Sequence, residues 1–419
     1  MNTSTKVVNS TFIPRDYQES LSDKASSILN RLKIVALIME VRTGKTITSF
    51  LTAEKSKCKK VLFITKKKVI ESNTILNDYN LVNPYFELTQ INYESVHKVK
   101  GNFDLFIIDE SHSLGAFPKP SIRTKRIKEL IGKSKLILLS GTITPESWSQ
   151  IYHQFWISDF TPFVEKSFYQ WAKNYVNVTQ KFVAHGNKAN DYSKANENLI
   201  RQKLSKYIVS FSQKEAGFSS SVKEHILYVR MKPTTYQLIR KIEKDLVFEG
   251  KNGGVILADT PVKKMQKIHQ LFSGTIKLED GSSATIDDTK ANFIKEKFAN
   301  KKIAIFYKFK QELNLLKTIF GSDLTTNLQE FKDTDKNIAL QFISGREGIS
   351  LKEADCIVAY NIDFSATTYF QFKDRLTTKE RLENKLYWIF AEDGLEKQIY
   401  KTVLEKKSFT LNHYKQIAI

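Results

Sequence analysis

Gly44, Lys45 and Thr46 follow an apolar run, residues 34–40, and precede a segment of helical character. This is the setting of a phosphate-binding loop, in which backbone N–H groups at a helix N-terminus surround the phosphates. A lysine there reaches the β- and γ-phosphates and a hydroxyl ligates Mg²⁺. The usual pattern has a glycine five positions before Gly44, where this chain has Met39. The residues that we expect to hold the phosphates are Thr43, Gly44, Lys45 and Thr46.

Asp109 and Glu110 end a second apolar run that begins at Phe103. An acidic pair in this position is by itself a common strand cap. Downstream of a phosphate loop, however, it completes the pair of motifs of an ATPase, in which the aspartate holds Mg²⁺ and the glutamate polarises the attacking water. We therefore expect Thr46 and Asp109 to ligate Mg²⁺, and Lys45 and Glu110 to serve catalysis.

Short apolar runs alternate with longer amphipathic segments in two separate parts of the chain. Runs of about six β-branched or aromatic residues, spaced by helix-length segments, are typical of strands in a buried parallel sheet. Two such series predict two α/β domains of the doubly wound kind. The runs are residues 34–40, 60–65, 105–110 and 136–141, then 302–307, 337–342, 356–361 and 386–391.

The stretch between the two series is polar and aromatic, with few runs of strand type. We expect a first domain over residues 1–150, a mainly helical insertion over 151–225, and a second domain over 226–419. Residues 233–249 have apolar positions at helical spacing, and 250–254 (GKNGG) are expected to form a flexible turn.

The 419 residues carry 65 Lys and Arg against 45 Asp and Glu, a net charge of +20. Such a surplus attracts polyanions, although a solvated basic surface gives the same composition. Cys58 and Cys356 have no metal-ligand spacing, which favours neither a disulfide framework nor a zinc site. Without a signal peptide or an apolar run near the roughly 20 residues that span a bilayer, we expect a soluble, cytoplasmic protein with no membrane partner.

Residues 109–112 (DESH) resemble the DEAD/H-type box of superfamily 2 helicases and translocases, and further motifs follow in that superfamily's order. The first motif of the superfamily often lacks the leading glycine, which accounts for Met39. The matching segments are 15–18 (RDYQ), 40–46 (EVRTGKT), 64–68 (ITKKK), 91–95 (INYES), 139–142 (LSGT), 344–351 (SGREGISL) and 371–375 (QFKDR). The resemblance implies two RecA-like parallel-sheet domains in tandem.

Within the superfamily, residues 91–95, 140–147 and 371–375 look closest to Swi/Snf-type ATPases. They especially resemble the compact versions that bacteriophages encode, as does the string 114–121 (LGAFPKPS). The resemblance implies a role in replication, recombination or repair of phage DNA, in the host cytoplasm.

The resemblance also assigns roles to residues, with ATP and Mg²⁺ as the ligands. Base and nucleotide contacts fall to Arg15, Tyr17, Gln18 and Gly348. Nucleic-acid contacts fall to Thr65, Lys66, Lys67, Lys68, Tyr93, Ser95, Ser344 and Arg346. Coupling of hydrolysis to strand movement falls to His112, Ser140, Gly141 and Thr142. Gln371 and Arg375 are expected to reach the nucleotide from the second domain.

The last motif departs from the family pattern, because position 378 is a threonine where a second arginine is usual. A delocalised cation must face the γ-phosphate as charge develops, and threonine lacks one. Arg375 is the first candidate for this arginine finger and Arg381 the second, with Lys379 as a weaker substitute. An ordinary exposed charge is the alternative for Arg381.

These observations favour an ATP-driven motor acting on duplex, forked or single-stranded DNA. An RNA-directed helicase and a DNA-binding clamp without hydrolysis remain as alternatives, the latter favoured only by Thr378. The basic residues Lys119, Arg123, Lys125 and Arg126 either extend the DNA track or form a solvated face. The aromatic insertion either packs between domains or acts as a wedge or clamp on the duplex.

Overall fold

Each half of the chain builds one six-stranded sheet in which every strand pair is parallel. The two units are Met1–Gly217 and Phe218–Ile419. The computed structural model describes residues 12–40, 42–145, 147–182, 188–217, 221–245, 247–249, 255–342, 351–376 and 383–405. The predicted fold class is confirmed: two RecA-like parallel-sheet domains stand in tandem.

The first sheet has the strand order β3-β2-β4-β5-β1-β8. Its central strands are buried on both faces, which is why their sequences are continuous apolar runs. Successive residues of β1 point to opposite faces, so that Ile34 joins one core and Val35 the other. The strands are β1 (Ile34–Met39), β2 (Lys60–Thr65), β3 (Glu87–Asn92), β4 (Leu105–Ile108), β5 (Lys135–Ser140) and β8 (Ile208–Phe211).

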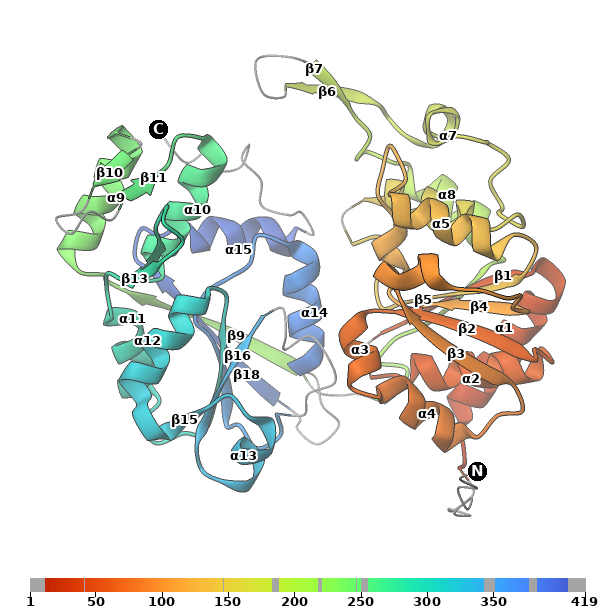
Figure 1. Ribbon diagram of the computed structural model, residues 1–419, viewed down its shortest axis with the longest axis horizontal. Helices are drawn as coiled ribbons and strands as arrows, with labels where there is room; N and C mark the ends of the chain where they lie inside the picture. Colours follow the sequence, from red (N-terminus) through yellow and green to blue (C-terminus); the bar gives the residue numbers. More distant parts are fainter. Residues whose placement is uncertain are drawn as a thin grey trace. The chain divides into compact units, whose positions relative to one another are not determined.

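Helices cover both faces of this sheet (Figure 1). One face packs against α1, α2 and α4, and the other against α5, α6, α7 and α8. The helices are α1 (Asp16–Leu32), α2 (Lys45–Lys55), α3 (Lys67–Glu71), α4 (Thr74–Val82), α5 (Ile122–Ile131), α6 (Ile151–Trp156), α7 (Phe168–Tyr175) and α8 (Glu197–Leu204), with 3-10 turns η1 (Tyr93–Lys98), η2 (Ser111–Leu114) and η3 (Trp148–Gln150).

Residues 151–217 belong to the first unit, whereas the sequence suggested a separate insertion over 151–225. The segment is helical in α6, α7 and α8, but it also contains the hairpin β6 (Thr179–Phe182) and β7 (Lys188–Asp191). It ends in β8, which pairs with β1 and becomes an edge of the first sheet. A four-residue strand of this kind carries too little apolar pattern to stand out from its surroundings.

The aromatic residues of this segment form a packed cluster on the first sheet rather than an exposed surface. Phe155, Phe168 and Trp171 are buried, and Trp171 stacks on Tyr175 with ring centroids 5.2 Å apart. Their burial provides a large part of the apolar area on this face of the unit. Tyr169 of α7 is exposed, at 45%.

His153 of α6 lies inside this cluster, 2% exposed, and its ring stacks on Phe168. Nδ1 donates a hydrogen bond to the carbonyl of Ala116, and burial lowers the pKa of the imidazole to about 4. The folded protein therefore binds fewer protons than the unfolded chain between that pH and about 6.5, so the contribution of His153 to stability is lost as pH falls through this window.

We expect the free energy of unfolding of the first unit to fall by about 2 kcal/mol more between pH 7 and pH 5 in the native chain than in a His153→Gln variant. Urea titrations followed by tryptophan fluorescence measure this difference. His97→Gln, at an exposed position, is the control and should keep the native pH dependence. Equal pH dependence in native and His153→Gln proteins would contradict the assignment.

The second sheet has the order β15-β16-β14-β17-β18-β9. All eight predicted runs are strands. The strands of the two six-stranded sheets that the sequence did not predict are the four edge strands, β3, β8, β9 and β15. The strands are β9 (Ser221–Val229), β14 (Ile303–Tyr307), β15 (Leu324–Thr325), β16 (Asn337–Gln341), β17 (Cys356–Ala359) and β18 (Glu383–Ala391).

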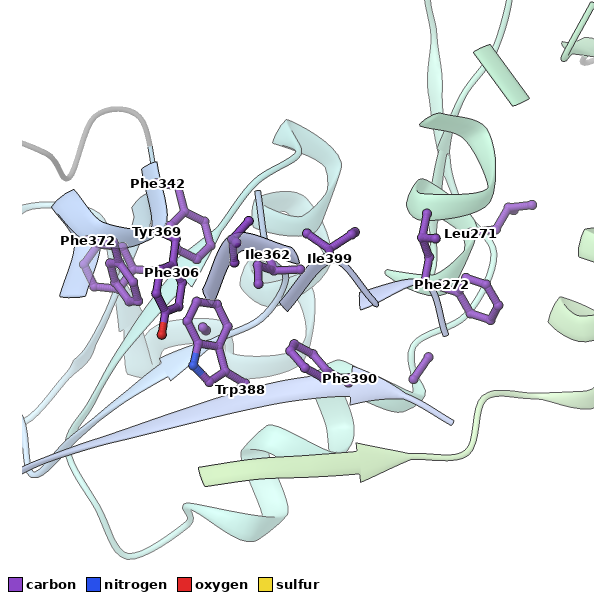
Figure 2. Close-up of a cluster of buried hydrophobic side chains, with 14 of the residues drawn as sticks. Leu271, Phe272, Phe306, Phe342, Ile362, Tyr369, Phe372, Trp388, Phe390 and Ile399 are labelled. Carbon is purple, nitrogen blue, oxygen red and sulfur yellow. The ribbon is translucent and has the colours of Figure 1, made fainter. Parts of the chain in front are cut away.

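One face of this sheet packs against α9, α10, α14 and α15, and the other against α11 and α12. Figure 2 shows part of the core on the face that packs against α9, α10, α14 and α15. There, Trp388 of β18 lies beside Tyr369 and Phe372 of α14. The helices are α9 (Pro233–Asp245), α10 (Pro261–Phe272), α11 (Thr289–Lys297), α12 (Lys310–Phe320), α13 (Leu328–Asp333), α14 (Ala366–Leu376) and α15 (Glu396–Leu404), with the 3-10 turn η5 (Gly321–Asp323).

Two short hairpins complete the second unit, β10 (Val247–Glu249) with β11 (Val255–Leu257) and β12 (Thr275–Lys277) with β13 (Ser283–Thr285). The helical pattern predicted over 233–249 ends at Asp245, because the last residues of the segment pair with β11. The turn predicted over 250–254 lies outside the described residues. Among the described residues, no helix combines the length and apolar character that crossing a bilayer requires.

Candidate nucleotide-binding site

The loop between β1 and α2 closes around Gly44, whose φ of 83° is a left-handed conformation that favours glycine. A Cβ atom at this position would lie only 2.2 Å from Nε2 of Gln18. The backbone conformation therefore favours glycine, and a larger residue here would also require the end of the Gln18 side chain to move. The predicted loop residue Gly44 and the predicted base contact Gln18 are neighbours in the structure.

Hydrogen bonds to the backbone fix the ends of this loop. Thr43 is fully buried, and its hydroxyl donates to the carbonyl of Glu40 at 2.7 Å. Thr48 donates from its backbone N–H at 3.0 Å and from its hydroxyl at 3.1 Å to the carbonyl of Gly44. Helix α2 begins at Lys45, so the N–H groups of its first turn and the positive end of its dipole face the loop. Lys45 and Thr46 are half-buried at that end.

The start of α1 forms the other wall. Gln18 is 3% exposed, and its Oε1 accepts a hydrogen bond from the backbone N–H of Arg15 at 3.0 Å. Arg15 Nη1 donates to the hydroxyl of Tyr17 at 2.7 Å, and the Tyr17 ring stacks on Phe211 at 4.6 Å. Phe211, the last residue of β8, was not singled out from the sequence. An aromatic residue ending a short apolar run was its only signal.

Asp109 follows β4 and lies next to the end of β2. Thr65 is fully buried, and its hydroxyl donates to Asp109 Oδ2 at 2.7 Å. Burial, together with the adjacent charge of Glu110, raises the pKa of Asp109 to about 6, while Thr65, Lys45 and Lys66 act in the opposite direction. Two lysines and two carboxylates from separate parts of the sequence thus share one electrostatic environment.

Glu110 and His112 extend this site toward β5. Glu110 has a φ of 50° and stands before the turn η2, with its Oε2 3.3 Å from Nδ1 of His112. His112 Nδ1 is also 3.1 Å from the hydroxyl of Ser140, which itself donates to the carbonyl of Thr142 at 2.8 Å. Burial lowers the pKa of His112, Lys66 and Lys45 lower it further, and Glu110 raises it. The residues predicted to couple hydrolysis to movement are therefore joined by direct contacts.

Gln154 of α6 forms a second link between the same two segments, one that the sequence did not reveal. It is fully buried; its Oε1 accepts from the hydroxyl of Ser111 at 2.9 Å, and its Nε2 donates to the carbonyl of Ile143 at 2.7 Å. Nε2 also donates to the carbonyl of Gln150 at 3.0 Å. One side chain thus ties the turn after the acidic pair to the loop after β5.

Replacing Gln154 with alanine should lower the free energy of unfolding of the first unit by about 2–3 kcal/mol, because the hydroxyl of Ser111 and the Ile143 carbonyl lose their buried partner. Chemical denaturation measures the change. Gln202→Ala, at an exposed position of α8, is the matched control and should change stability by less than about 0.5 kcal/mol. A neutral Gln154→Ala substitution would show that the bridge does not hold the two segments.

Comparisons with known proteins show no family for this chain. No family model matches the sequence, and no curated protein matches it. Among solved structures, the chain is similar to the Sulfolobus solfataricus SWI2/SNF2 ATPase core in complex with dsDNA, at 13% identity and a TM-score of 0.42. The likeness covers 94% of this chain and 91% of that one. A likeness of this degree does not identify which residues act.

The residues predicted to contact nucleic acid have different environments. Lys66 is half-buried, and Lys67 and Lys68 are exposed at the start of α3. Tyr93 is 3% exposed, and its hydroxyl donates to the backbone carbonyl of Asp109. The backbone N–H of Ser95 donates to Oδ1 of Asn92 at 2.8 Å. Thr65 and Tyr93 therefore contact Asp109 directly, which gives them a place in the acidic site.

A basic surface borders Tyr93. The Arg123 guanidinium lies 4.8 Å from the centre of the Tyr93 ring and 3.7 Å from a carboxylate oxygen of Glu94. A cavity of about 550 Å³ opens there, between η1 and the first turn of α5. Lys119, Lys125 and Arg126 are exposed nearby in the sequence. The assignment of these basic residues to a DNA track stays a prediction.

The second unit carries the remaining predicted residues. Gln371 and Arg375 are positions of α14, which ends at Leu376, and the structure describes the backbone of both residues. The other predicted residues lie outside the described part of the chain; they are Ser344, Arg346, Gly348, Thr378, Lys379 and Arg381.

The first unit has the donors that a nucleoside triphosphate with Mg²⁺ requires. Lys45 and the N-terminus of α2 suit phosphate oxygens, and the Thr46 hydroxyl and Asp109 carboxylate are the oxygen ligands that Mg²⁺ prefers. Burial and, after it, the neighbouring charge of Glu110 raise the pKa of Asp109, and a bound cation would favour the charged form of this carboxyl group. Within the described ranges no group of three or more His, Cys, Asp and Glu side chains gathers to hold a metal.

Proposed function

We propose that this chain is an ATP-dependent DNA motor, a helicase or translocase that couples ATP hydrolysis to movement along DNA. The observation that carries the proposal is the convergence of Lys45, Asp109 and Glu110 at one edge of the first sheet. Open α/β sheets bind ligands at the carboxyl ends of their strands, and these residues follow β1 and β4 there. Motifs of Swi/Snf-type ATPases in the same order support the motor reading.

The first unit would hold the nucleotide. Gln18, with Arg15 or Tyr17, contacts the base, and Lys45 neutralises the β- and γ-phosphates. Mg²⁺, held through Thr46 and Asp109, would draw charge from the phosphate oxygens. Glu110 orients the attacking water and accepts its proton as the bond to the γ-phosphorus forms, and the terminal oxygen of ADP leaves with the bonding electrons.

The second unit would complete the site on closure. Gln371 and Arg375 come from α14, and a guanidinium placed against the γ-phosphate stabilises charge that develops only in the transition state. The free energy of nucleotide binding is thereby coupled to domain closure, and alternating closure and opening gives stepping.

A conformational change on ATP hydrolysis would reach the DNA-binding residues through the contacts between the turn after Asp109 and Glu110 and the loop after β5. His112 bonds Ser140, and Gln154 joins Ser111 to Ile143. A change at Glu110 is thus passed to residues 140–143 through two short links. Lys66 and its neighbours would bind the DNA through its phosphates, because a motor must bind DNA of any base sequence.

Steady-state ATP hydrolysis tests the proposal, measured without nucleic acid and with single-stranded DNA, duplex DNA, forked DNA and RNA. We expect low basal turnover and strong stimulation by DNA. Stimulation by RNA alone would show that the chain is an RNA helicase and not a DNA motor. Equal turnover under every condition would overturn the proposal of a motor. Strand-displacement and triplex-displacement assays then separate unwinding from translocation.

The arginine finger has a separate test. Arg375→Ala should lower DNA-stimulated kcat by roughly 10²-fold, with ATP affinity nearly unchanged, because the lost cation acts on the transition state. Arg381→Ala should do the same if the second candidate holds the role. Arg240→Ala, exposed on α9, is the control and should hydrolyse ATP normally. If neither candidate lowers kcat, the assignment of this motif is wrong.

The chain would serve the DNA of a bacteriophage, in replication, recombination or repair. This part of the proposal rests on the resemblance of residues 91–95, 114–121, 140–147 and 371–375 to the compact Swi/Snf-type ATPases of phages.

A further inference from the structure

Glu224 of β9 gathers hydrogen bonds from four side chains of the second unit. Its carboxylate accepts from the Tyr369 hydroxyl at 2.9 Å, the Trp388 indole N–H at 2.8 Å and the Tyr400 hydroxyl at 3.0 Å. Lys373 Nζ lies 2.6 Å from Oε1. The donors come from α14, β18 and α15, so a single carboxylate joins three elements to the edge strand.

Two of these donors belong to α14 and lie one turn apart. Tyr369 and Lys373 are four residues apart, which places them on one face of the helix, so both bonds to Glu224 fix the same face. Position 371 lies two residues after Tyr369, and position 375 lies two residues after Lys373. Each is therefore rotated by about 200° around the helix axis from the residue that contacts Glu224. The contact with Glu224 therefore sets the rotation of the helix that carries Gln371 and Arg375.

The surroundings make this contact hard to replace. Trp388 is fully buried and Tyr369 is 2% exposed, and Figure 2 shows the two side by side in the core. The Glu224 side chain is itself only 11% exposed. Burial raises the pKa of Glu224, but the bonds from Lys373, Trp388 and Tyr369 outweigh it and hold the pKa below its usual value. The group is a carboxylate at neutral pH, and without it the buried donors of Tyr369 and Trp388 would lose this partner.

We infer that Glu224 is a positioning residue that orients α14 and thereby brings Arg375 into register for hydrolysis. The inference rests on the proposed function, because it gives the orientation of α14 a catalytic consequence. Glu224 does not touch the nucleotide in this scheme; it acts through Tyr369 and Lys373.

Glu224→Ala tests the inference, with Asp287→Ala as the matched control. Asp287 is also a buried carboxylate of the second unit with a lowered pKa, and it accepts from Thr235, Thr289 and the backbone of Lys232, none of which lies on α14. Both variants lose a buried acceptor, so both should be destabilised. Only Glu224→Ala should release α14.

Amide hydrogen exchange reports on α14 without any need for ATP hydrolysis. Exchange over residues 366–376 should rise at least about tenfold in Glu224→Ala and stay near the native rate in Asp287→Ala. Equal protection of α14 in the native and Glu224→Ala proteins would overturn the anchoring role, whatever the activity of the chain.

Kinetics then test the catalytic consequence well below the melting temperature. Glu224→Ala should lower DNA-stimulated kcat by roughly tenfold or more and leave binding of a fluorescent ATP analogue unchanged, whereas Asp287→Ala should keep native kcat. In an Arg375→Ala background, Glu224→Ala should cause little further loss, because both act through one cation. Two results would overturn the inference. One is a double variant whose loss of kcat equals the product of the two single losses, and the other is a native kcat in Glu224→Ala. Absence of DNA-stimulated hydrolysis in the native chain would instead overturn the proposed function.

Discussion

Replacing Lys45 with alanine is expected to lower DNA-stimulated ATP hydrolysis by roughly 10³-fold and to weaken ATP binding by about 10- to 100-fold. Lys45 begins α2 beside the phosphate loop, and its charge acts on Asp109. The ammonium group would neutralise the β- and γ-phosphates in the bound state and more strongly in the transition state. Initial rates and the binding of a fluorescent ATP analogue measure the two effects separately.

Lys60→Ala is the control for this substitution. Lys60 is exposed at the first residue of β2, at the amino end of the same sheet and away from the loop. It removes the same charge from the same unit, so its rate should stay near that of the native chain. A Lys45→Ala variant with native turnover would show that this loop does not serve hydrolysis.

Glu110→Gln is expected to have an effect of similar size by a different route. The amide cannot accept the proton of the attacking water, so kcat should fall by roughly 10³-fold while ATP affinity stays near its native value. The substitution keeps the size of the side chain next to His112, which limits structural change at the 3.3 Å contact. Single-turnover hydrolysis and equilibrium binding give the two quantities.

Glu129→Gln, at an exposed position of α5, is the matched control and should leave both quantities unchanged. If Glu110→Gln instead loses ATP affinity and keeps kcat, Glu110 binds the nucleotide without activating water, and another base must be sought among the neighbours of Asp109. A loss of ATP affinity in Lys45→Ala but not in Glu110→Gln would thus separate phosphate binding from the chemical step.

Much of the candidate nucleotide-binding site could be predicted from the sequence, because its residues belong to short local patterns. The loop around Gly44 follows a buried strand and opens a helix, and the acidic pair ends another buried strand. A strand covered on both faces must be apolar throughout, so its ends are easy to locate, and parallel strands place those ends along one edge. Because the phosphate loop and the later acidic pair form the motif pair of an ATPase, Lys45, Asp109 and Glu110 were expected to act together.

Edge strands were harder to recognise. β8 is four residues long, and β9 has several half-buried positions that give no continuous apolar run. Residues 151–217 belong to the first unit, and β8 at the end of this segment pairs with β1. Most of the first unit lies between these two strands in the sequence, so no local pattern predicts the pairing.

The sequence by itself determined the two parallel-sheet domains, the phosphate loop and the acidic pair, since each follows from burial or from backbone conformation over a few residues. Tertiary structure alone decided that Thr65 and Tyr93 contact Asp109, that Gln154 joins Ser111 to Ile143, and that Glu224 holds α14. Each of these contacts joins a side chain to a group outside its own element; Glu224 and Tyr400, for example, are 176 residues apart. The partner of a buried polar group depends on which elements pack together, and no local pattern of residues encodes that.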